Sequence, residues 1–249
     1  MVGSSLDEEL DMLQSRVRPL EQLVGAFAAT LGPPLKYHSG QVHYGFRYAK
    51  PDERHFCLLK CSRAVSALNA SIVLARHGYP QEIAVLIRTL IECTTHVKYV
   101  LNGRQSDGEL TAEMKKYVQG YFSDFARNTA SDFKRTDLRQ GAVHNAIGKD
   151  LEKFALDGVD PSKLLSNVYL TYSNYVHAKY PEAMELYGGI PGRFHVCGMS
   201  GTPKDNENVL AIEAFIDDVS NTLKLLILQL NLKPLLSENR ALREWYNGR

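Results

Sequence analysis

The sequence lacks the features that mark membrane and exported proteins. Its most apolar stretch, residues 223–232, is interrupted by Lys224, Gln229 and Asn231 and falls far short of the roughly 20 residues needed to span a bilayer. The N-terminal segment is acidic and contains no positively charged stretch followed by an apolar one, so we expect no export signal. The sequence therefore predicts a soluble, cytoplasmic protein that does not enter a membrane.

Neither sign of charge dominates the composition. The 29 Lys and Arg residues against 28 Asp and Glu residues give a formal net charge of +1, which provides no global attraction to nucleic acid or to an anionic membrane. Any site for RNA must therefore be a local cluster of side chains.

Cysteine is scarce and forms no CxxC pair among its four residues, which favours reduced thiols over disulfides in a cytoplasmic protein. His55, Cys57 and Cys61 supply three candidate zinc ligands, but their spacing lacks a second pair and matches no common zinc motif. We interpret these cysteines as buried core residues. A glycine-rich nucleotide loop after a strand, GxSxG and HExxH are also absent, so we expect no metal site and no cofactor.

An apolar spacing of three or four residues recurs along most of the chain and predicts an all-α fold. We expect one domain over residues 1–249, a bundle of about six or seven helices. Pro19 should kink or divide the first helix. The helices are predicted over about residues 6–31, 51–77, 80–102, 107–135, 144–156, 162–178 and 206–232.

Two segments lack helical spacing. Residues 32–51 interleave aromatic side chains with His38, His43 and Arg47, a mixture that could stack bases and hold phosphates. Because no nucleic-acid module spacing accompanies it, we favour a surface loop pinned by its aromatic residues. Residues 187–203 contain five glycines and two prolines and predict a long loop before the C-terminal helix, or at most a short hairpin, that could close over a site.

A polar stripe crosses the apolar helix predicted over residues 80–102. Arg88, Glu92 and His96 are spaced four residues apart and so share one face of that helix. Apolar residues cover most of its remaining circumference, which indicates that the helix is nearly surrounded by protein. Buried charges of this kind need polar partners.

The same spacing recurs near the end of a later helix, where Tyr169, Ser173 and His177 form a second stripe. Pro181 stops that helix just after His177, and in its last turn the helix dipole and a carboxylate would both favour the imidazolium form. We infer that the two stripes face each other. Two interpretations remain open: a polar network that fixes helix register, or a reactive site.

These motifs resemble a family of mostly uncharacterised bacterial all-helical proteins related to the HEPN superfamily. The likeness rests on an R-x-x-x-E helix, AVLIRTLIECTTHVKYVL, and a Y-x-x-x-S-x-x-x-H helix end, YLTYSNYVHAKYPE, and covers about residues 56–181. The resemblance implies a helical bundle that dimerises across this face. It also implies metal-independent cleavage of RNA in a toxin or phage-defence system, with an antitoxin or defence protein as partner.

The resemblance also implies roles for individual residues. The HEPN signature places an arginine four to six residues before the histidine, whereas residues 170–173 contain none, so Arg88 would replace it from the other helix. Arg88 would stabilise the phosphorane charge, His177 would act as general base on a ribose 2′-hydroxyl, and Glu92 would orient one of them. The residues expected to position the RNA or nucleotide are His96, Tyr169, Ser173 and Asn174.

The alternative is a non-catalytic helical protein that binds a ligand or a partner and uses the Arg/Glu/His network structurally. The neutral net charge favours this alternative, whereas the glycine-rich loop next to His177 favours a site. His195, within that loop, is a candidate additional member of the site.

Overall fold

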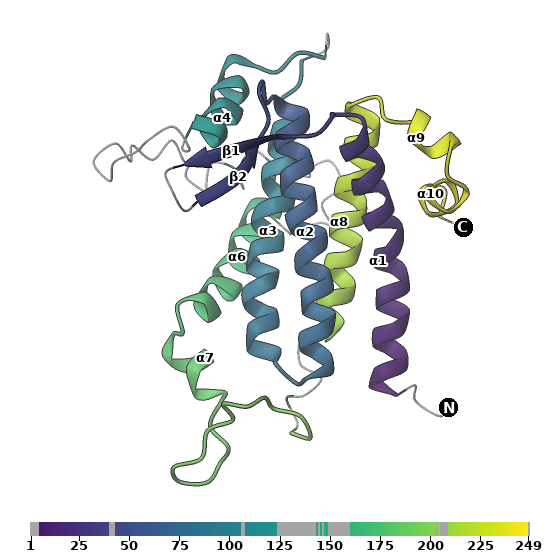
Figure 1. Ribbon diagram of the computed structural model, residues 1–249. Helices are drawn as coiled ribbons and strands as arrows, with labels where there is room; N and C mark the ends of the chain where they lie inside the picture. The colour runs from purple at the N-terminus through teal and green to yellow at the C-terminus, as the bar shows by residue number, and fades with distance from the viewer. Residues whose placement is uncertain are drawn as a thin grey trace.

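Two long helices joined by a very short turn form the centre of the protein. α2 (Glu53–Arg76) and α3 (Pro80–Asn102) run antiparallel, as the sequence predicts (Figure 1). Gly78 makes the turn possible, because its φ of +68° suits glycine and an added Cβ would collide with Ser200. Pro80 then occupies the first turn of α3, where no backbone N–H is required.

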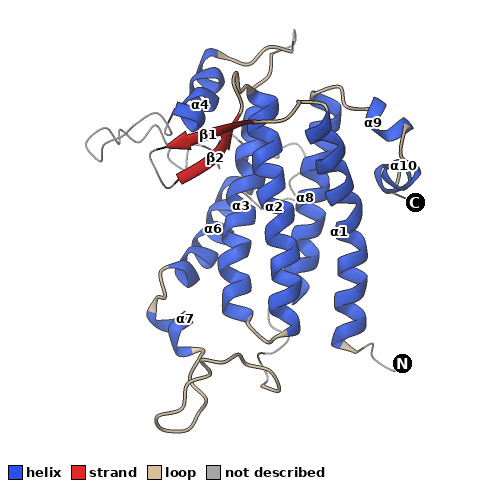
Figure 2. Ribbon diagram, in the orientation of Figure 1, coloured by secondary structure: helices blue, strands red, loops and turns tan. Residues whose placement is uncertain are grey.

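The fold class predicted from the sequence is confirmed. Among the described residues the chain is a single, mostly all-α domain with nine helices and one small two-stranded sheet (Figure 2). The short helices α7, α9 and α10 bring the number above the six or seven predicted. The computed structural model describes residues 5–39, 43–105, 108–123, 143, 145, 147–148, 160–202, 204 and 209–248.

α1 (Leu6–Ala29) and α8 (Val209–Gln229) pack against α2 and complete a four-helix core with α3. Ser5 and Glu8 form a capping box at the start of α1. Pro19 lies inside α1 without dividing it, contrary to one of the two outcomes expected from the sequence. Buried residues before and after Pro19 hold the helix on the bundle and offset the hydrogen bond that proline removes.

The apolar composition of α2 follows from its central position. Among the described residues it is the one helix whose length and hydropathy would allow it to cross a membrane, and half of that apolar window is buried inside the protein. α1, α3 and α8 all contact it. Ala64, Ala67 and Ala75 are buried and keep its surface small, which allows the neighbouring helices to approach closely.

Cys57 and Cys61 are buried core residues, as predicted, and Cys93 is a third. Cys57 and Cys61 lie in α2 and Cys93 in α3, and burial raises the pKa of each thiol above its ordinary value. The thiols therefore stay protonated near neutral pH and are poor nucleophiles. Within the described ranges, no group of three His, Cys, Asp or Glu side chains is placed to hold a metal ion.

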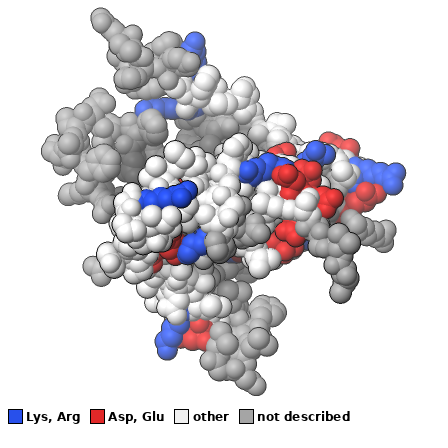
Figure 3. Space-filling view, turned by 90° about the horizontal axis from the view of Figure 1, so that it is seen from below, with Lys and Arg blue, Asp and Glu red and all other residues white. Residues whose placement is uncertain are grey.

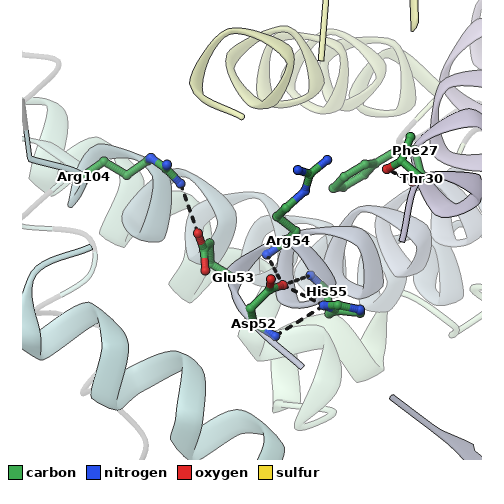
Figure 4. A network of polar contacts seen from close by, with 7 residues as sticks. All are labelled: Phe27, Thr30, Asp52, Glu53, Arg54, His55 and Arg104. Carbon is green, nitrogen blue, oxygen red and sulfur yellow. Dashed lines mark hydrogen bonds and ion pairs between the residues drawn. The ribbon is translucent and has the colours of Figure 1, made fainter. Parts of the chain in front are cut away.

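A polar network fixes the start of α2 (Figure 4). The Asp52 carboxylate accepts hydrogen bonds from the backbone N–H groups of Arg54 and His55, and its Oδ1 lies 2.6 Å from His55 Nδ1. Burial alone would raise the pKa of Asp52, but its hydrogen bonds with His55 lower the pKa below its ordinary value. Glu53 meets Arg104 from the end of α3 at 3.4 Å, which ties the central helices together at this end.

The segment predicted as an aromatic surface loop is instead largely a β-hairpin. β1 (Leu35–Ser39) pairs antiparallel with β2 (His43–Arg47), and Leu35 lies opposite Arg47. The overlooked signal is the alternation of Tyr44, Phe46 and Tyr48, which has the two-residue period of a strand. Aromatic residues favour strands.

α4 (Ala112–Ser123) occupies part of the helix predicted over residues 107–135. Its aromatic stripe packs on Phe56 of α2, with ring centroids 5.7 Å away at Tyr117 and 5.0 Å away at Tyr121. Residues 124–142 and most of the predicted helix over 144–156 lie outside the described residues.

Residues 160–202, which we call the arm, lie along α3 and below the α2–α3 turn (Figure 1). The arm contains α6 (Pro161–Val176), α7 (Tyr180–Met184) and the glycine-rich loop. Of all its residues only Met199 is buried. Leu165, Val168 and Tyr172 of α6 are partly buried and pack against the hydrophobic core, and polar contacts add to this docking.

The glycine-rich loop is irregular, as predicted, with one isolated bridge between Tyr187 and Phe194. Its contacts lie at the α2–α3 turn, where the Met199 N–H donates to the Gly78 carbonyl over 2.7 Å. The expectation that this loop closes over the polar stripes is therefore not met. α9 (Pro234–Ser237) and α10 (Arg240–Tyr246) follow α8 and end beside α1.

Candidate functional site at the α3–α6 seam

α6 packs against α3 along a seam where the two predicted polar stripes meet. The Gln81 side chain donates to the Glu182 carbonyl at one end, and Arg88 contacts Tyr169 and Ser173 further along, so the two segments run antiparallel. The inference that the stripes face each other is confirmed for these residues. It rested on the four-residue spacing within each helix, which the structure retains.

Arg88 is the centre of the seam. Its Nε donates to Ser173 Oγ over 2.8 Å, and its Nη2 donates to the Tyr169 hydroxyl and, over 3.2 Å, to Glu92 Oε1. The guanidinium carbon also lies 3.5 Å from the centroid of the Tyr169 ring. These contacts come from both helices, so Arg88 links α6 to α3 directly.

Burial differs sharply between the two members of the ion pair. The Arg88 side chain is 13% exposed, whereas that of Glu92 is 41% exposed. Arg88 Nη1 is buried and, among the described residues, has no hydrogen-bond partner. The two N–H donors of Nη1 therefore stay free among the described residues, and the carboxylate partner of Arg88 stands at the solvent edge of the seam.

The two hydroxyls on α6 act on Arg88 in different ways. Burial raises the pKa of Tyr169, and the Arg88 charge opposes this shift without cancelling it, so the phenol stays protonated near neutral pH. Ser173 Oγ donates its proton to the Tyr169 carbonyl over 2.8 Å while accepting from Arg88. Because its proton bonds to the backbone, Ser173 is suited to hold Arg88 rather than to act as a nucleophile.

His177 stands at the exposed end of the α6 stripe. It is the C-terminal cap residue, one turn beyond Ser173, and its backbone N–H donates to the Ser173 carbonyl over 3.1 Å. In the described part of the chain its imidazole takes part in no hydrogen bond or ion pair. The carboxylate partner expected from the sequence is therefore not found there.

Two of the predicted substrate-positioning residues do not join the seam contacts. The His96 ring packs edge-on against Tyr117 of α4 with centroids 5.8 Å apart, although it shares a helix face with Arg88. Eight residues advance a helix by about 12 Å, which carries His96 to the α4 end of the bundle. Asn174 follows Ser173 and is half-buried, but no hydrogen bond joins its side chain to Arg88.

Sequence reasoning missed a second polar assembly, within the arm. The Tyr175 hydroxyl lies 3.2 Å from each Glu185 carboxylate oxygen, and Lys204 Nζ lies 3.3 Å from Glu185 Oε1. Beside this assembly the structure has a cavity of about 480 Å³, and a smaller one of about 200 Å³ adjoins it at His195 and Met199. The five glycines between residues 187 and 203 were the available signal.

The central helices match one known family of proteins. The profile of a family of unknown function, DUF5677, matches residues 54–129, which include Arg88 and Glu92 but not the α6 stripe. No curated protein and no solved structure shows a match to the chain. These comparisons assign no activity, and nothing in them ties the chain to the HEPN superfamily.

Proposed function

We propose that the α3–α6 seam is the reaction centre of a HEPN-like, metal-independent ribonuclease or a related nucleotide-directed phosphotransfer protein. The supporting observation is that Arg88 is held between the helices by Tyr169 and Ser173, the residues that precede the exposed His177 on one stripe. A cation and a free imidazole on one face are the groups that base-catalysed phosphodiester cleavage requires.

In this mechanism the His177 imidazole takes the proton from a ribose 2′-hydroxyl. The 2′-oxygen attacks the adjacent phosphorus, and the bond from phosphorus to the 5′-oxygen breaks. The 5′-oxygen leaves with a proton from the imidazolium or from water, which gives a 2′,3′-cyclic phosphate and a 5′-hydroxyl end. Arg88 offsets the negative charge that builds on the phosphoryl oxygens.

Glu92 determines how a phosphate reaches Arg88. Its contact with Arg88 Nη2, at 3.2 Å, is longer than the Ser173 contact, and its side chain is 41% exposed. Rotation of Glu92 into solvent leaves Nη2 free for a phosphate oxygen, beside the unpartnered Nη1. A bound phosphate would then form the ion pair with Arg88 that Glu92 forms when no phosphate is bound.

A second candidate function is favoured by the low exposure of Arg88. At 13% exposure, with contacts to Tyr169, Ser173 and Glu92, the guanidinium already has most of its partners. In a non-catalytic protein that binds a ligand or a partner, the seam would serve only to dock the arm. The two candidates differ in whether removal of His177 changes an activity.

Cleavage of a mixed RNA pool in the presence of a chelator separates the candidates. We expect the intact protein to produce cyclic-phosphate ends, and we expect His177→Ala and Arg88→Ala to lose at least about a hundredfold in rate. The matched controls are His77→Ala, which alters the exposed cap residue of α2, and Arg104→Ala, which removes a comparably buried arginine. Full cleavage by folded His177→Ala would favour the second candidate, as would no cleavage by the intact protein.

The proposal includes a homodimer across the face of α6, with an antitoxin or defence protein as a further partner. Leu164 and Leu170 support it, because their side chains on α6 are 54% and 58% exposed. A dimer across this face would bring two copies of the seam together. The molar mass of the intact chain in solution tests this point.

A further inference from the structure

The larger cavity in the arm is separate from the α3–α6 seam. It has a volume of about 480 Å³, within the range of cavities that hold small ligands. Its lining includes Glu185, Tyr187, Arg193, His195, Met199 and Lys204. None of these residues belongs to the two polar stripes. The surface around the lower end of the arm shows few charged side chains, whereas charges gather on the α1 side (Figure 3).

The described lining of this cavity carries an excess of positive charge. It holds two permanent cations, Arg193 and Lys204, and one carboxylate, Glu185. That carboxylate already accepts Lys204 and the Tyr175 hydroxyl. The Arg193 guanidinium makes no hydrogen bond or ion pair with any other residue that the structure describes. An anionic group on a ligand would therefore find Arg193 unneutralised.

Another part of the lining is suited to a flat apolar group. Met199 is 3% exposed and forms the inner wall, while the Tyr187 ring is braced by Phe194, with centroids 5.5 Å apart. A thioether and a braced phenol ring are favourable surfaces for a planar ring. Together with Arg193, they match a molecule that has an anionic head and a ring.

Gly188 allows the cationic side of the cavity to form. A Cβ at this position would lie 3.0 Å from His195 Nε2 and 3.3 Å from the Arg193 carbonyl, closer than ordinary contacts. The Gly188 N–H also donates to that carbonyl over 2.9 Å. The glycine therefore lets His195 and Arg193 approach the backbone of residue 188 at the cavity wall.

We propose that this cavity binds an organic anion the size of a mononucleotide. Arg193 contacts the phosphate, and Tyr187 and Met199 contact the ring. The site is independent of the reaction proposed at the α3–α6 seam, because the two share no residue.

Calorimetric titration of the full chain with adenosine 5′-monophosphate tests the proposal. We expect saturable binding, and we expect Arg193→Ala to weaken it by about tenfold or more, because a charge-assisted contact is lost. Gly188→Ala should also weaken it, by displacing His195 and Arg193. Arg240→Ala, which removes an exposed arginine paired with Glu244, is the matched control and should bind as the intact chain does.

Adenosine and inorganic phosphate serve as half-ligands, and each should bind more weakly than the nucleotide. Three results would overturn the proposal: no binding at millimolar nucleotide, equal affinity in folded Arg193→Ala, or binding by phosphate alone as tight as by the nucleotide. Nucleotide binding at the cavity is read from heat in Arg193→Ala, whereas the ribonuclease reaction is read from RNA ends in His177→Ala. Failure at this cavity is therefore distinguishable from failure of the ribonuclease proposal.

Discussion

Arg88 combines a structural and a proposed chemical role in one side chain. It donates to Ser173 and Tyr169 on α6 and to Glu92 on its own helix. The first two contacts dock the arm, and the third can be exchanged for a phosphate. The structural role must therefore be measured before the loss of activity in any Arg88 variant is interpreted.

Replacing Arg88 by alanine should destabilise the protein. The change removes the Arg88 contacts of the Tyr169 hydroxyl and Ser173, and we expect the free energy of unfolding to fall by about 1–3 kcal/mol. Urea denaturation followed by circular dichroism measures this loss. Arg240→Ala, at an arginine whose side chain is 83% exposed, should change the value by less than about 0.5 kcal/mol. Equal stabilities for both variants would show that Arg88 does not dock α6.

Replacing Glu92 by glutamine tests whether this carboxylate competes with phosphate for Arg88. The substitution keeps the hydrogen-bonding shape and removes the charge, so a 2′-deoxy oligonucleotide should bind roughly three- to tenfold more tightly. Fluorescence anisotropy at constant salt gives the affinity. Glu244→Gln, far along the chain and paired with Arg240, is the matched control. An affinity that falls or does not change would argue against the exchange.

Asp52 makes stability depend on pH at the start of α2. Its pKa is lower in the folded protein than in the unfolded chain, so its charge stabilises the fold above the unfolded value of about 4. That contribution is lost as the pH falls through the folded pKa. Asp52→Asn keeps a capping side chain, so the difference in unfolding free energy between the two proteins should be present at pH 7 and vanish in acid. A difference that persists in acid would contradict the assignment.

The elements of the bundle differ in how they are held. α2 and α3 carry buried residues along their whole length, whereas α6 carries none. Segments with few buried apolar contacts open at low free energy. The arm is therefore expected to be the least stable part of the described chain.

Amide hydrogen exchange should show this difference. We expect the amides of α6 and α7 to exchange faster than those of α2 and α3, and Arg88→Ala to accelerate α6 while leaving α8 unchanged. Peptide-level mass spectrometry resolves these helices. Protection of α6 equal to that of α3 would mean that the arm is part of the cooperative core.

The sequence predicted correctly the helices that carry a clear spacing of apolar residues or clear start and end signals. The 3.6-residue period placed α3 and α8 correctly, and Asp52, Gly78 and Pro80 marked the ends of α2 and its connection to α3. The hairpin at Leu35–Arg47 was missed because its two-residue alternation is short and partly polar. Division of the first helix at Pro19 was wrong because the local cost of proline does not include the tertiary contacts that hold α1 on the bundle.

Helical spacing also predicted which residues meet at the seam. It did not predict contacts that depend on how the helices and loops are placed in three dimensions. Arg88, Tyr169 and Ser173 meet because each stripe keeps helical spacing. His96 does not join the seam because it lies too far from Arg88 along the axis of α3, and its ring packs against Tyr117 instead. The cavity beside His195 depends on a loop path that no periodicity describes.

At the scale of the whole molecule, the protein is a four-helix core that carries the arm through partly buried apolar side chains and polar contacts. The core positions Arg88, and the arm supplies Tyr169, Ser173, His177 and the separate cavity. The proposed reaction needs both parts, because the proposed cation, Arg88, lies in the core and the proposed base, His177, lies in the arm. The proposed cleavage of RNA should therefore require the arm to be docked on the core.

Cleavage of one defined RNA oligonucleotide tests the proposed chemistry most directly. The intact protein, in excess chelator, should convert it to fragments that end in 2′,3′-cyclic phosphate, and the all-2′-deoxy form of the same oligonucleotide should remain intact. Mass spectrometry of the products identifies these ends. Survival of the RNA at high protein concentration would contradict the proposal, as would cleavage of the deoxy form.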